Sequence, residues 1–246
     1  PLMPTKRINI WSSPRNISTA FMYAFAQRSD TSVVDEPLYA HYLTHTTSEA
    51  AHPGHEEILA SQSSDAQVVI RDIIFGDYNT PIVLFKQMTH HLIELDRRFM
   101  QKTENVLLIR DPRAIIASYA KVIPNPNMYD IGVEMQYELM QQLQGWDSLT
   151  AIVDAKDLLL DPPGMLRKLC ERLDIPFDSD MLSWQAGARP EDGIWAKYWY
   201  DNVHRSTGFK PYVEKTIEIP PELEDLAIEC APFYDALYAA SLGQNS

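Results

Sequence analysis

The sequence predicts an α/β fold in which about five parallel strands form one sheet with helices on both faces. One observation is a series of short, mainly apolar runs at residues 8–11, 32–35, 82–85, 106–109 and 151–153. The other is that segments with apolar residues at helical spacing separate these runs. Apolar strands that alternate with helices are typical of a parallel sheet covered on both sides.

The composition limits the classes of protein to which the chain can belong. The chain has 246 residues with 45% hydrophobic residues, which is ordinary for a globular protein with a proper core. A net charge of −13 argues against nucleic acid or an anionic membrane as a partner. A small polyanionic ligand remains compatible, because a few arginines and helix N-termini can form a local positive pocket. Length alone allows one domain or two, and we expect one α/β domain over residues 1–246.

Targeting and redox features are sparse. The two cysteines, Cys170 and Cys230, lie in helix-like apolar patterns, and we interpret them as buried thiols. No signal peptide and no apolar run of about 18 residues is apparent, so we expect no membrane span and a cytoplasmic location. The sequence does not indicate an oligomeric state.

The first strand leads through a short loop into a helix that begins near Ser18. The first N–H groups of a helix have no partner inside it, so a strand, loop and helix in this order can bind an anion. Arg15 adds a fixed charge that suits phosphate or sulfate, and Ser18 and Thr19 add hydroxyl groups. Residues 12–19 contain no glycine, and Ile17 stands where a Walker A motif has lysine. An ordinary Ser-Pro turn capped by Asn16 or Ser18 is the alternative interpretation.

The second strand ends in two carboxylates, Asp35 and Glu36, before Pro37 stops regular structure. Asp35 could instead cap a following turn. If the strand continues, the two side chains point to opposite faces of the sheet. Nearby His41 and His45 have the i,i+4 spacing of a helical pair, but no cysteine or paired acid completes a ligand set, so we predict no metal site.

The third strand ends in Lys86, followed by His90 and His91. We expect Thr89 to cap a helix that runs to about residue 100. On a helix the two histidines differ by about 100° in direction, so we expect only one to face the cleft. Ligands bind at the carboxyl ends of parallel strands, which places these side chains beside the first loop.

The fourth strand end is the most informative. Arg110 stands at the strand tip, Asp111 is a good helix N-cap and Pro112 a good first helical residue. Ser118 follows about 9 Å into that helix, so Arg110 and Ser118 could hold the same phosphate. We interpret Arg113 as a member of a surface ion pair. Further helices are predicted over residues 129–148, 165–173 and 220–242.

Taken together, the chain resembles a P-loop sulfotransferase of the bacterial type from about residue 8 to residue 209. The order of Pro14, Arg15, Ser18 and Thr19 is similar to the loop that holds the 5′-phosphosulfate of 3′-phosphoadenosine 5′-phosphosulfate (PAPS). Arg110 and Ser118 have the eight-residue separation of the arginine and serine that hold its 3′-phosphate. The fold implied is a P-loop-type parallel sheet.

Later segments carry weaker parts of the resemblance. Residues 151–177 resemble a strand, turn and helix that end in an L-x-I-P-F exit, with Lys156 in place of a usual glutamate. Arg205 with Gly208 resembles the R-x-G loop that closes over the 3′-phosphate, one residue longer. The aromatic residues at 195 and 198–200 could form an acceptor or adenine wall, and core packing is an equal alternative. The chain departs from the family at Arg15, Ile17 and Ala20, where lysine, glycine and tryptophan are usual.

The resemblance implies transfer of a sulfuryl group from PAPS to a hydroxyl or amine of a small-molecule acceptor, without a metal. The residues that it assigns to PAPS are Arg15, Asn16, Ile17, Ser18, Thr19, Arg110, Ser118, Arg205 and Gly208. It places Lys86 on the bridging or sulfuryl oxygens, with Arg15 stabilising the leaving phosphate. Glu36 is the first candidate for the base, His90 the second and His91 the third. The alternatives are an ATP-dependent kinase and a nucleotide-binding protein without transfer activity.

Overall fold

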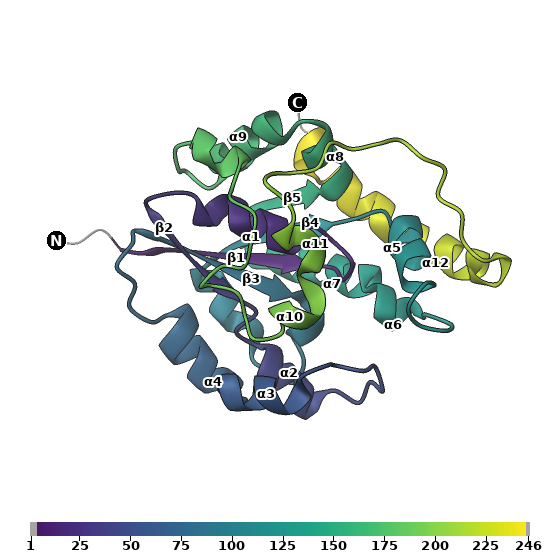
Figure 1. Cartoon of the computed structure of the whole chain (residues 1–246), viewed down its shortest axis with the longest axis horizontal. Helices are drawn as coiled ribbons and strands as arrows, with labels where there is room; N and C mark the ends of the chain where they lie inside the picture. Colours follow the sequence, from purple (N-terminus) through teal and green to yellow (C-terminus); the bar gives the residue numbers. More distant parts are fainter. Residues whose placement is uncertain (1–3, 245–246) are drawn as a thin grey trace.

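The computed structural model describes residues 4–244, and its centre is a five-stranded sheet. The strand order is β2-β3-β1-β4-β5, and every neighbouring pair is parallel (Figure 1). The strands are β1 (Lys6–Ser12), β2 (Thr31–Asp35), β3 (Ile82–Met88), β4 (Glu104–Ile109) and β5 (Ala151–Asp154). The predicted fold class is therefore confirmed, and all five predicted strands are present.

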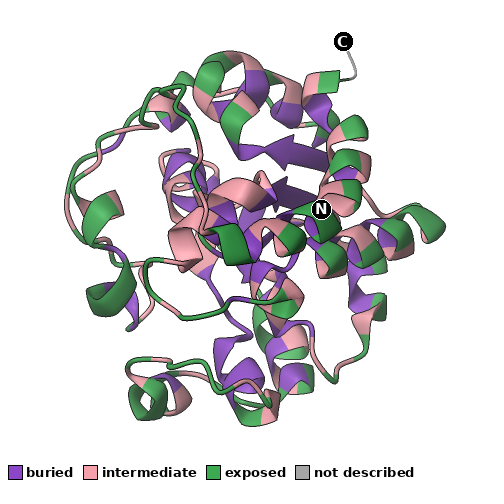
Figure 2. Ribbon diagram, turned by 90° about the vertical axis from the view of Figure 1, so that its right-hand side faces the viewer, coloured by how far each residue is buried: buried purple, intermediate pink, exposed green. Residues whose placement is uncertain are grey.

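Helices cover both faces of the sheet, as the apolar strands indicated. Because side chains alternate along a strand, Ile8 and Ile10 of β1 pack on one side with α1 (Ser18–Ala26) and α9 (Pro162–Arg172). Trp11 and the odd-numbered residues of β3 and β4 pack on the other side with α7 (Val133–Gly145) and α12 (Glu224–Ala239). Figure 2 shows the strands as the buried interior and the exposed residues on the surrounding helices and loops.

The other elements lie around this core. The remaining α-helices are α2 (Tyr39–His45), α3 (His55–Ser61), α4 (Ala66–Val69), α5 (Pro112–Tyr119), α6 (Met128–Ile131), α8 (Ala155–Leu160), α10 (Ala196–Trp199) and α11 (Asp201–His204). Short 3₁₀ or π turns occur at Ile70–Ile74, Thr89–His91, Arg97–Lys102, Ser179–Leu182, Pro221–Leu223 and Leu242–Gln244.

Three helix predictions need correction. The continuous helix expected from Thr89 to about residue 100 is wrong, because Glu94 has a φ of 45° and separates two 3₁₀ turns. The helix expected over residues 129–148 is divided at Gly132, whose φ of 80° suits glycine alone. The terminal helix starts later and ends earlier than predicted, at Glu224–Ala239. The interpretation of Arg113 is confirmed, since its guanidinium lies 2.9 Å from the Glu224 carboxylate at the surface.

Candidate functional site

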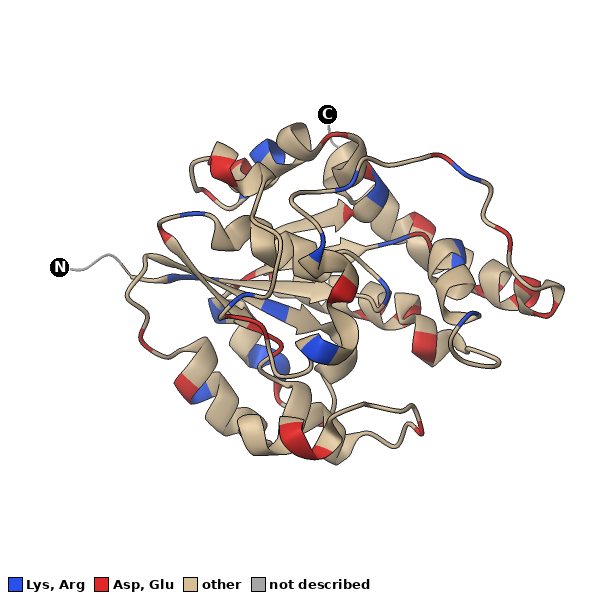
Figure 3. Ribbon diagram, viewed as in Figure 1, with Lys and Arg blue, Asp and Glu red and all other residues tan. Residues whose placement is uncertain are grey.

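A cavity of about 1690 Å³ lies at the carboxyl ends of the strands. Each of the five strand ends contributes to its wall, as expected for a parallel α/β sheet. The contributing segments include residues 13–20 after β1, Glu36 after β2, the end of β3, Arg110 after β4 and Asp154 of β5. Figure 3 shows Lys and Arg positions in the loops that follow β1 and β4, next to this edge of the sheet.

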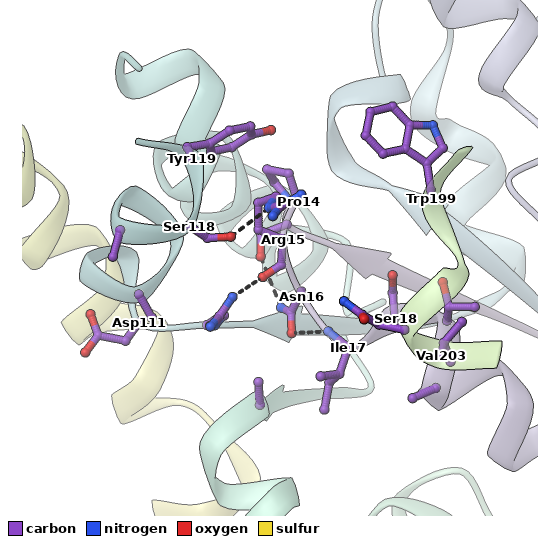
Figure 4. A pocket seen from close by; sticks show the side chains of 18 of the residues that line it. Pro14, Arg15, Asn16, Ile17, Ser18, Asp111, Ser118, Tyr119, Trp199 and Val203 are labelled. Atoms are coloured by element: carbon purple, nitrogen blue, oxygen red, sulfur yellow. Dashed lines mark hydrogen bonds between the residues drawn. The ribbon is translucent and has the colours of Figure 1, made fainter. Parts of the chain in front are cut away.

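The loop after β1 holds its shape without glycine because Asn16 ties it together. The Asn16 amide nitrogen donates to Ser13 Oγ at 3.1 Å and to the Leu108 carbonyl oxygen at 3.3 Å. Its amide oxygen accepts from the Ile17 N–H at 2.8 Å (Figure 4). Helix α1 then starts at Ser18 without a side-chain cap, and its first intrahelical bond runs from the Phe21 N–H to the Ile17 carbonyl oxygen. The preceding N–H groups of α1 thus face the cavity side of the loop, where an anion can accept from them.

Arg15 adopts a left-handed backbone, with a φ of 54°, that is uncommon for a residue with a side chain. The turn brings Arg15 Nε to 2.8 Å from Ser118 Oγ on α5 (Figure 4). Arg110 at the tip of β4 donates to the Arg15 carbonyl oxygen. The structure therefore places Arg15 beside the predicted pair of Arg110 and Ser118, which the sequence did not indicate. We call residues 13–19 together with Arg110 and Ser118 the anion cradle.

Two positive groups lie close together in the anion cradle. Partial burial, and then the positive charge of Arg15, lower the pKa of Arg110. Like charges held together in this way repel each other, and a bound anion removes that repulsion. The Ser118 hydroxyl and the start of α1 add donors without charge. The anion cradle therefore has the donors and the charge to hold phosphate or sulfate groups.

A second group of charged side chains lies on the same cavity but is buried. Lys86 Nζ is 3.1 Å from Glu36 Oε2 and 3.3 Å from Asp35 Oδ1, and it donates to the Tyr200 hydroxyl at 2.6 Å. The exposed fractions of the Lys86, Asp35 and Glu36 side chains are 4%, 1% and 9%. We call Asp35, Glu36, Lys86 and Tyr200 the charge cluster.

Asp35 and Glu36 were expected to point to opposite faces only if the strand continued to Glu36, and it does not. The strand β2 ends at Asp35, and Glu36 has a left-handed φ of 41°. This turn rotates the Glu36 side chain out of the alternation of the strand, so both carboxylates reach Lys86. Arg15 and Glu36 are thus strained non-glycine residues at two strand ends of one cavity, and strain of this kind concentrates at functional sites.

Burial and the neighbouring charges together set the pKa values in the charge cluster. Burial raises the pKa of Glu36, and the nearby Asp35 charge adds to this effect, while Lys86 opposes it. Burial disfavours the charge of Lys86, but Asp35 and Glu36 outweigh it and raise the pKa of Lys86. Burial also holds the pKa of His91 well below its usual value, so His91 is neutral.

The two histidines occupy different places. His90 bonds to the Tyr129 carbonyl oxygen through Nε2 at 2.6 Å and packs against Gly132. His91 is buried between the rings of Tyr39 and Tyr42, and its Nε2 lies 4.0 Å from Glu36 Oε1. Both line the cavity, but His91 is the one beside Glu36. The order of the candidate bases stays a prediction.

The late aromatic residues divide into two groups. Trp195 and Tyr200 are buried, and the Trp195 Nε1–H donates to the Tyr200 hydroxyl at 3.0 Å. Trp199 is 48% exposed and lines the cavity, and Figure 4 shows it on the side opposite Tyr119, with Ser18 nearby. Tyr198 contacts Glu57 at the outer surface. Packing in the interior therefore applies to Trp195 and Tyr200, and a wall for the acceptor or adenine stays a prediction for Trp199.

Of the two loop residues expected to close over the 3′-phosphate, Arg205 and Gly208, only Gly208 lies at the cavity. Gly208 lines the cavity and bridges to Ser183, and a Cβ at Gly208 would lie 2.9 Å from the Leu182 carbonyl oxygen. Arg205, in contrast, is exposed at the end of α11 and is not among the described residues that line the cavity. Lys210 lines the cavity instead. The sequence analysis did not include Lys210 among the site residues, although it lies only two positions after Gly208.

Two features of other kinds, a metal site and a membrane-spanning helix, are absent from the described residues. Within residues 4–244, no group of three or more His, Cys, Asp or Glu residues is arranged to hold a metal ion. In the same described part of the chain, no helix is both long enough and apolar enough to cross a membrane.

Comparison with known proteins gives a consistent result. The model of a family described as "Sulfotransferase domain" matches residues 6–241. A branched-chain-amino-acid aminotransferase-like protein of Arabidopsis thaliana is 37% identical over 231 residues, which is 94% of this chain and 41% of that protein. This chain thus spans about two-fifths of the length of that relative, and the name describes the whole of the longer protein.

Two solved structures share the fold. The sulfotransferase domain from the curacin biosynthetic pathway has a TM-score of 0.51 and 18% identity, covering 95% of this chain and 98% of that chain. A sulfotransferase from Alicyclobacillus acidocaldarius has a TM-score of 0.54 and 11% identity, covering 95% of this chain and 94% of that chain.

Proposed function

The chain belongs to the sulfotransferase domain family, and on this premise we propose that it transfers a sulfuryl group from PAPS to a hydroxyl or amine of a small-molecule acceptor. The observation that carries the proposal is that the anion cradle and the charge cluster line one cavity. The first offers donors for a polyanionic nucleotide and the second offers a carboxylate for an acceptor proton. We also propose that the matched region acts as one domain, and a cytoplasmic location stays a prediction of the sequence.

The residues of the anion cradle fit a nucleotide with two anionic groups. The resemblance places Arg15 at the 5′-phosphosulfate, but Arg15 Nε bonds to Ser118 Oγ and the Arg15 carbonyl oxygen accepts from Arg110. We therefore reassign Arg15 to the 3′-phosphate, together with Arg110 and Ser118. We assign Ser18, Thr19 and the first N–H groups of α1 to the 5′-phosphosulfate. Asn16 and Ile17 shape the loop, and Gly208 and Lys210 lie on the adjoining wall. When bound, PAPS supplies the sulfuryl group and a phosphate that can leave.

In this proposal Glu36 takes the acceptor proton. A carboxylate with a raised pKa is a stronger base than an exposed one, once it is ionised. Lys86 lies beside it and carries the positive charge that faces the developing negative charge. His91 is neutral and next to Glu36, so it is the alternative base within the same group of residues.

One observation favours a second candidate, a nucleotide-binding protein without transfer activity. Lys86 is already engaged by two carboxylates and by the Tyr200 hydroxyl. If these contacts persist when a nucleotide binds, Lys86 cannot approach a sulfuryl group. The kinase alternative has no such support, because the loop lacks the lysine of a Walker A motif.

A transfer assay separates these candidates. Sulfur-labelled PAPS is incubated with panels of alcohols, phenols and amines, with chelator present, and labelled products are counted. Transfer to any acceptor class, abolished by Glu36→Gln, supports the proposal. PAPS binding without transfer to any class supports the nucleotide-binding candidate. Turnover in a separate assay with ATP and Mg²⁺, without chelator, supports the kinase.

A further inference from the structure

The hydrogen bonds of Tyr200 are unequal, and the inequality assigns roles within the charge cluster. Lysine and tryptophan nitrogens can only donate, so the Tyr200 oxygen accepts from Lys86 at 2.6 Å and from Trp195 at 3.0 Å. The single hydroxyl hydrogen then has to choose between the carboxylates. Asp35 Oδ2 is 2.7 Å away and Glu36 Oε2 is 3.4 Å away, so the hydrogen is donated to Asp35.

Asp35 has a further donor that Glu36 lacks. The Gly193 N–H donates to Asp35 Oδ2 at 3.0 Å, so this oxygen accepts two hydrogen bonds. The other oxygen, Oδ1, lies 3.3 Å from Lys86 Nζ and has no hydrogen-bond partner among the described residues. Among the described residues, the Glu36 carboxylate has Lys86 at 3.1 Å as its one close donor. Hydrogen bonds to an ionised group favour its charged form, so the surroundings stabilise the negative charge on Asp35 more than on Glu36.

The charge balance of the charge cluster requires that one of the two carboxyl groups carries a proton. Two carboxylates and one ammonium group carry a net charge of −1 when all are ionised, and an uncompensated buried charge is costly. One proton removes the excess. Glu36 lines the large cavity, whereas Asp35 lines a separate cavity of about 270 Å³. A proton on Glu36 can therefore exchange with the large cavity.

We propose that Tyr200 is a positioning residue whose hydroxyl joins Asp35 to Lys86 as a fixed ion pair, and so leaves Glu36 as the carboxyl of the cluster that exchanges its proton with the cavity. The use of that proton in catalysis rests on the proposed function, but its location does not. The described groups that face Glu36 are Asp35 of β2, Tyr39 of α2, Lys86 of β3, His91 of the following 3₁₀ turn, and Tyr200.

The other facing groups do not compete for the proton. Lys86 keeps its charge because its pKa is raised by the two carboxylates against the effect of burial. His91 stays neutral because burial lowers its pKa. Tyr39 and Tyr200 keep their hydroxyl hydrogens because burial raises the pKa of both. The proton therefore binds to one of the two carboxyl groups. The hydrogen bond from Tyr200 to Asp35 determines that this group is Glu36.

The test is a carboxyl titration by NMR of the whole chain with ¹³C-labelled Asp and Glu carboxyl carbons, between about pH 4 and 9. Asp35→Asn and Glu36→Gln identify the two signals. In the unaltered protein we expect the Glu36 signal to move and the Asp35 signal to stay in place. In Tyr200→Phe we expect both signals to move together, because Asp35 has lost its hydroxyl donor and shares the proton.

Tyr198→Phe is the matched control, since it removes the same atom from an exposed tyrosine of α10, two residues before Tyr200, that contacts Glu57. It should leave both signals as in the unaltered protein. Movement of the Asp35 signal in the unaltered protein, or an unchanged pattern in Tyr200→Phe, overturns the proposal. If Tyr200→Phe does not fold, as judged by circular dichroism, the titration of the unaltered protein still decides. None of these outcomes depends on PAPS or on turnover.

Discussion

The anion cradle and the charge cluster line the same cavity, but they handle charge in opposite ways. In the anion cradle Arg110 donates to the Arg15 carbonyl oxygen, and the two side chains are partly exposed. In the charge cluster, Lys86 is buried against two carboxylates and donates a hydrogen bond to the Tyr200 hydroxyl. Water and a bound anion can compensate the positive charge of the anion cradle, whereas the buried charges of the charge cluster must be balanced by one another. We infer that the first region is built to gain a ligand and the second to move a proton.

The largest effect, on turnover, should come from replacing Glu36, the proton-exchanging carboxyl group of the charge cluster. Glu36→Gln keeps the shape of the side chain but cannot take a proton, so turnover should fall by about 10²–10⁴-fold. The affinity for 3′-phosphoadenosine 5′-phosphate (PAP) should not change, because Glu36 does not belong to the anion cradle. Rates at saturating PAPS and PAP titrations measure both quantities.

His90→Asn is the companion variant for this prediction. His90 is bonded to the Tyr129 carbonyl oxygen and is the second candidate base. If Glu36→Gln keeps the normal rate while His90→Asn loses it, the assignment of the base to Glu36 is wrong.

Removing the cation of the charge cluster should cost stability. Lys86→Met leaves two buried carboxylates without their counter-ion, and breaking a buried pair typically costs about 3–5 kcal/mol in the free energy of unfolding. Urea denaturation measures the loss. Lys197→Met is the control, because its pair with Glu57 is exposed and should contribute little. Equal stability of the two variants would show that the charge cluster is not an electrostatic unit.

Disruption of the anion cradle should affect binding and leave the fold intact. Arg110→Ala removes a charge-assisted bond worth about 1.5–3 kcal/mol, so PAP should bind about 10–150-fold more weakly. Affinity for ADP, which lacks the 3′-phosphate, should change much less. Arg113→Ala is the control, because Arg113 pairs with Glu224 at the surface. A parallel loss of PAP and ADP affinity in Arg110→Ala contradicts the assignment.

The smallest effect concerns the dependence of stability on pH. Because the pKa of Glu36 is raised in the folded state, the native protein binds a proton that the unfolded chain has already released. The free energy of unfolding should therefore fall as the pH rises from the unfolded pKa of about 4.5 through the folded pKa. Glu36→Gln should lose this part of the pH dependence, and urea titrations at several pH values of both proteins measure the difference. Identical profiles would contradict the raised pKa.

The sequence predicted the parts of the site that depend on local order. Arg110 and Ser118 belong to one strand-helix unit, where an N-cap at Asp111 and the helical rise determine their distance. The loop after β1 and the start of α1 at Ser18 were predicted in the same way. All five strands were predicted because each is a short apolar run.

The remaining parts depend on contacts between distant segments. The pairing of Asp35 and Glu36 with Lys86 requires β2 to lie beside β3 and Glu36 to take a left-handed backbone, and neither follows from local pattern. Tyr200 reaches Asp35 across 165 positions of sequence. The division of the helix at Gly132 and the outward position of Arg205 likewise depend on tertiary packing, which overrides helical periodicity.

The central claim is that the anion cradle binds a nucleotide by its 3′-phosphate in an acidic chain with no Walker A lysine. Calorimetric titration of the unaltered protein with PAP and with ADP, both with chelator present, tests it most directly. The account predicts that PAP binds at least about tenfold more tightly than ADP, because we assign Arg15, Arg110 and Ser118 to the added phosphate. Equal affinities for PAP and ADP would contradict it.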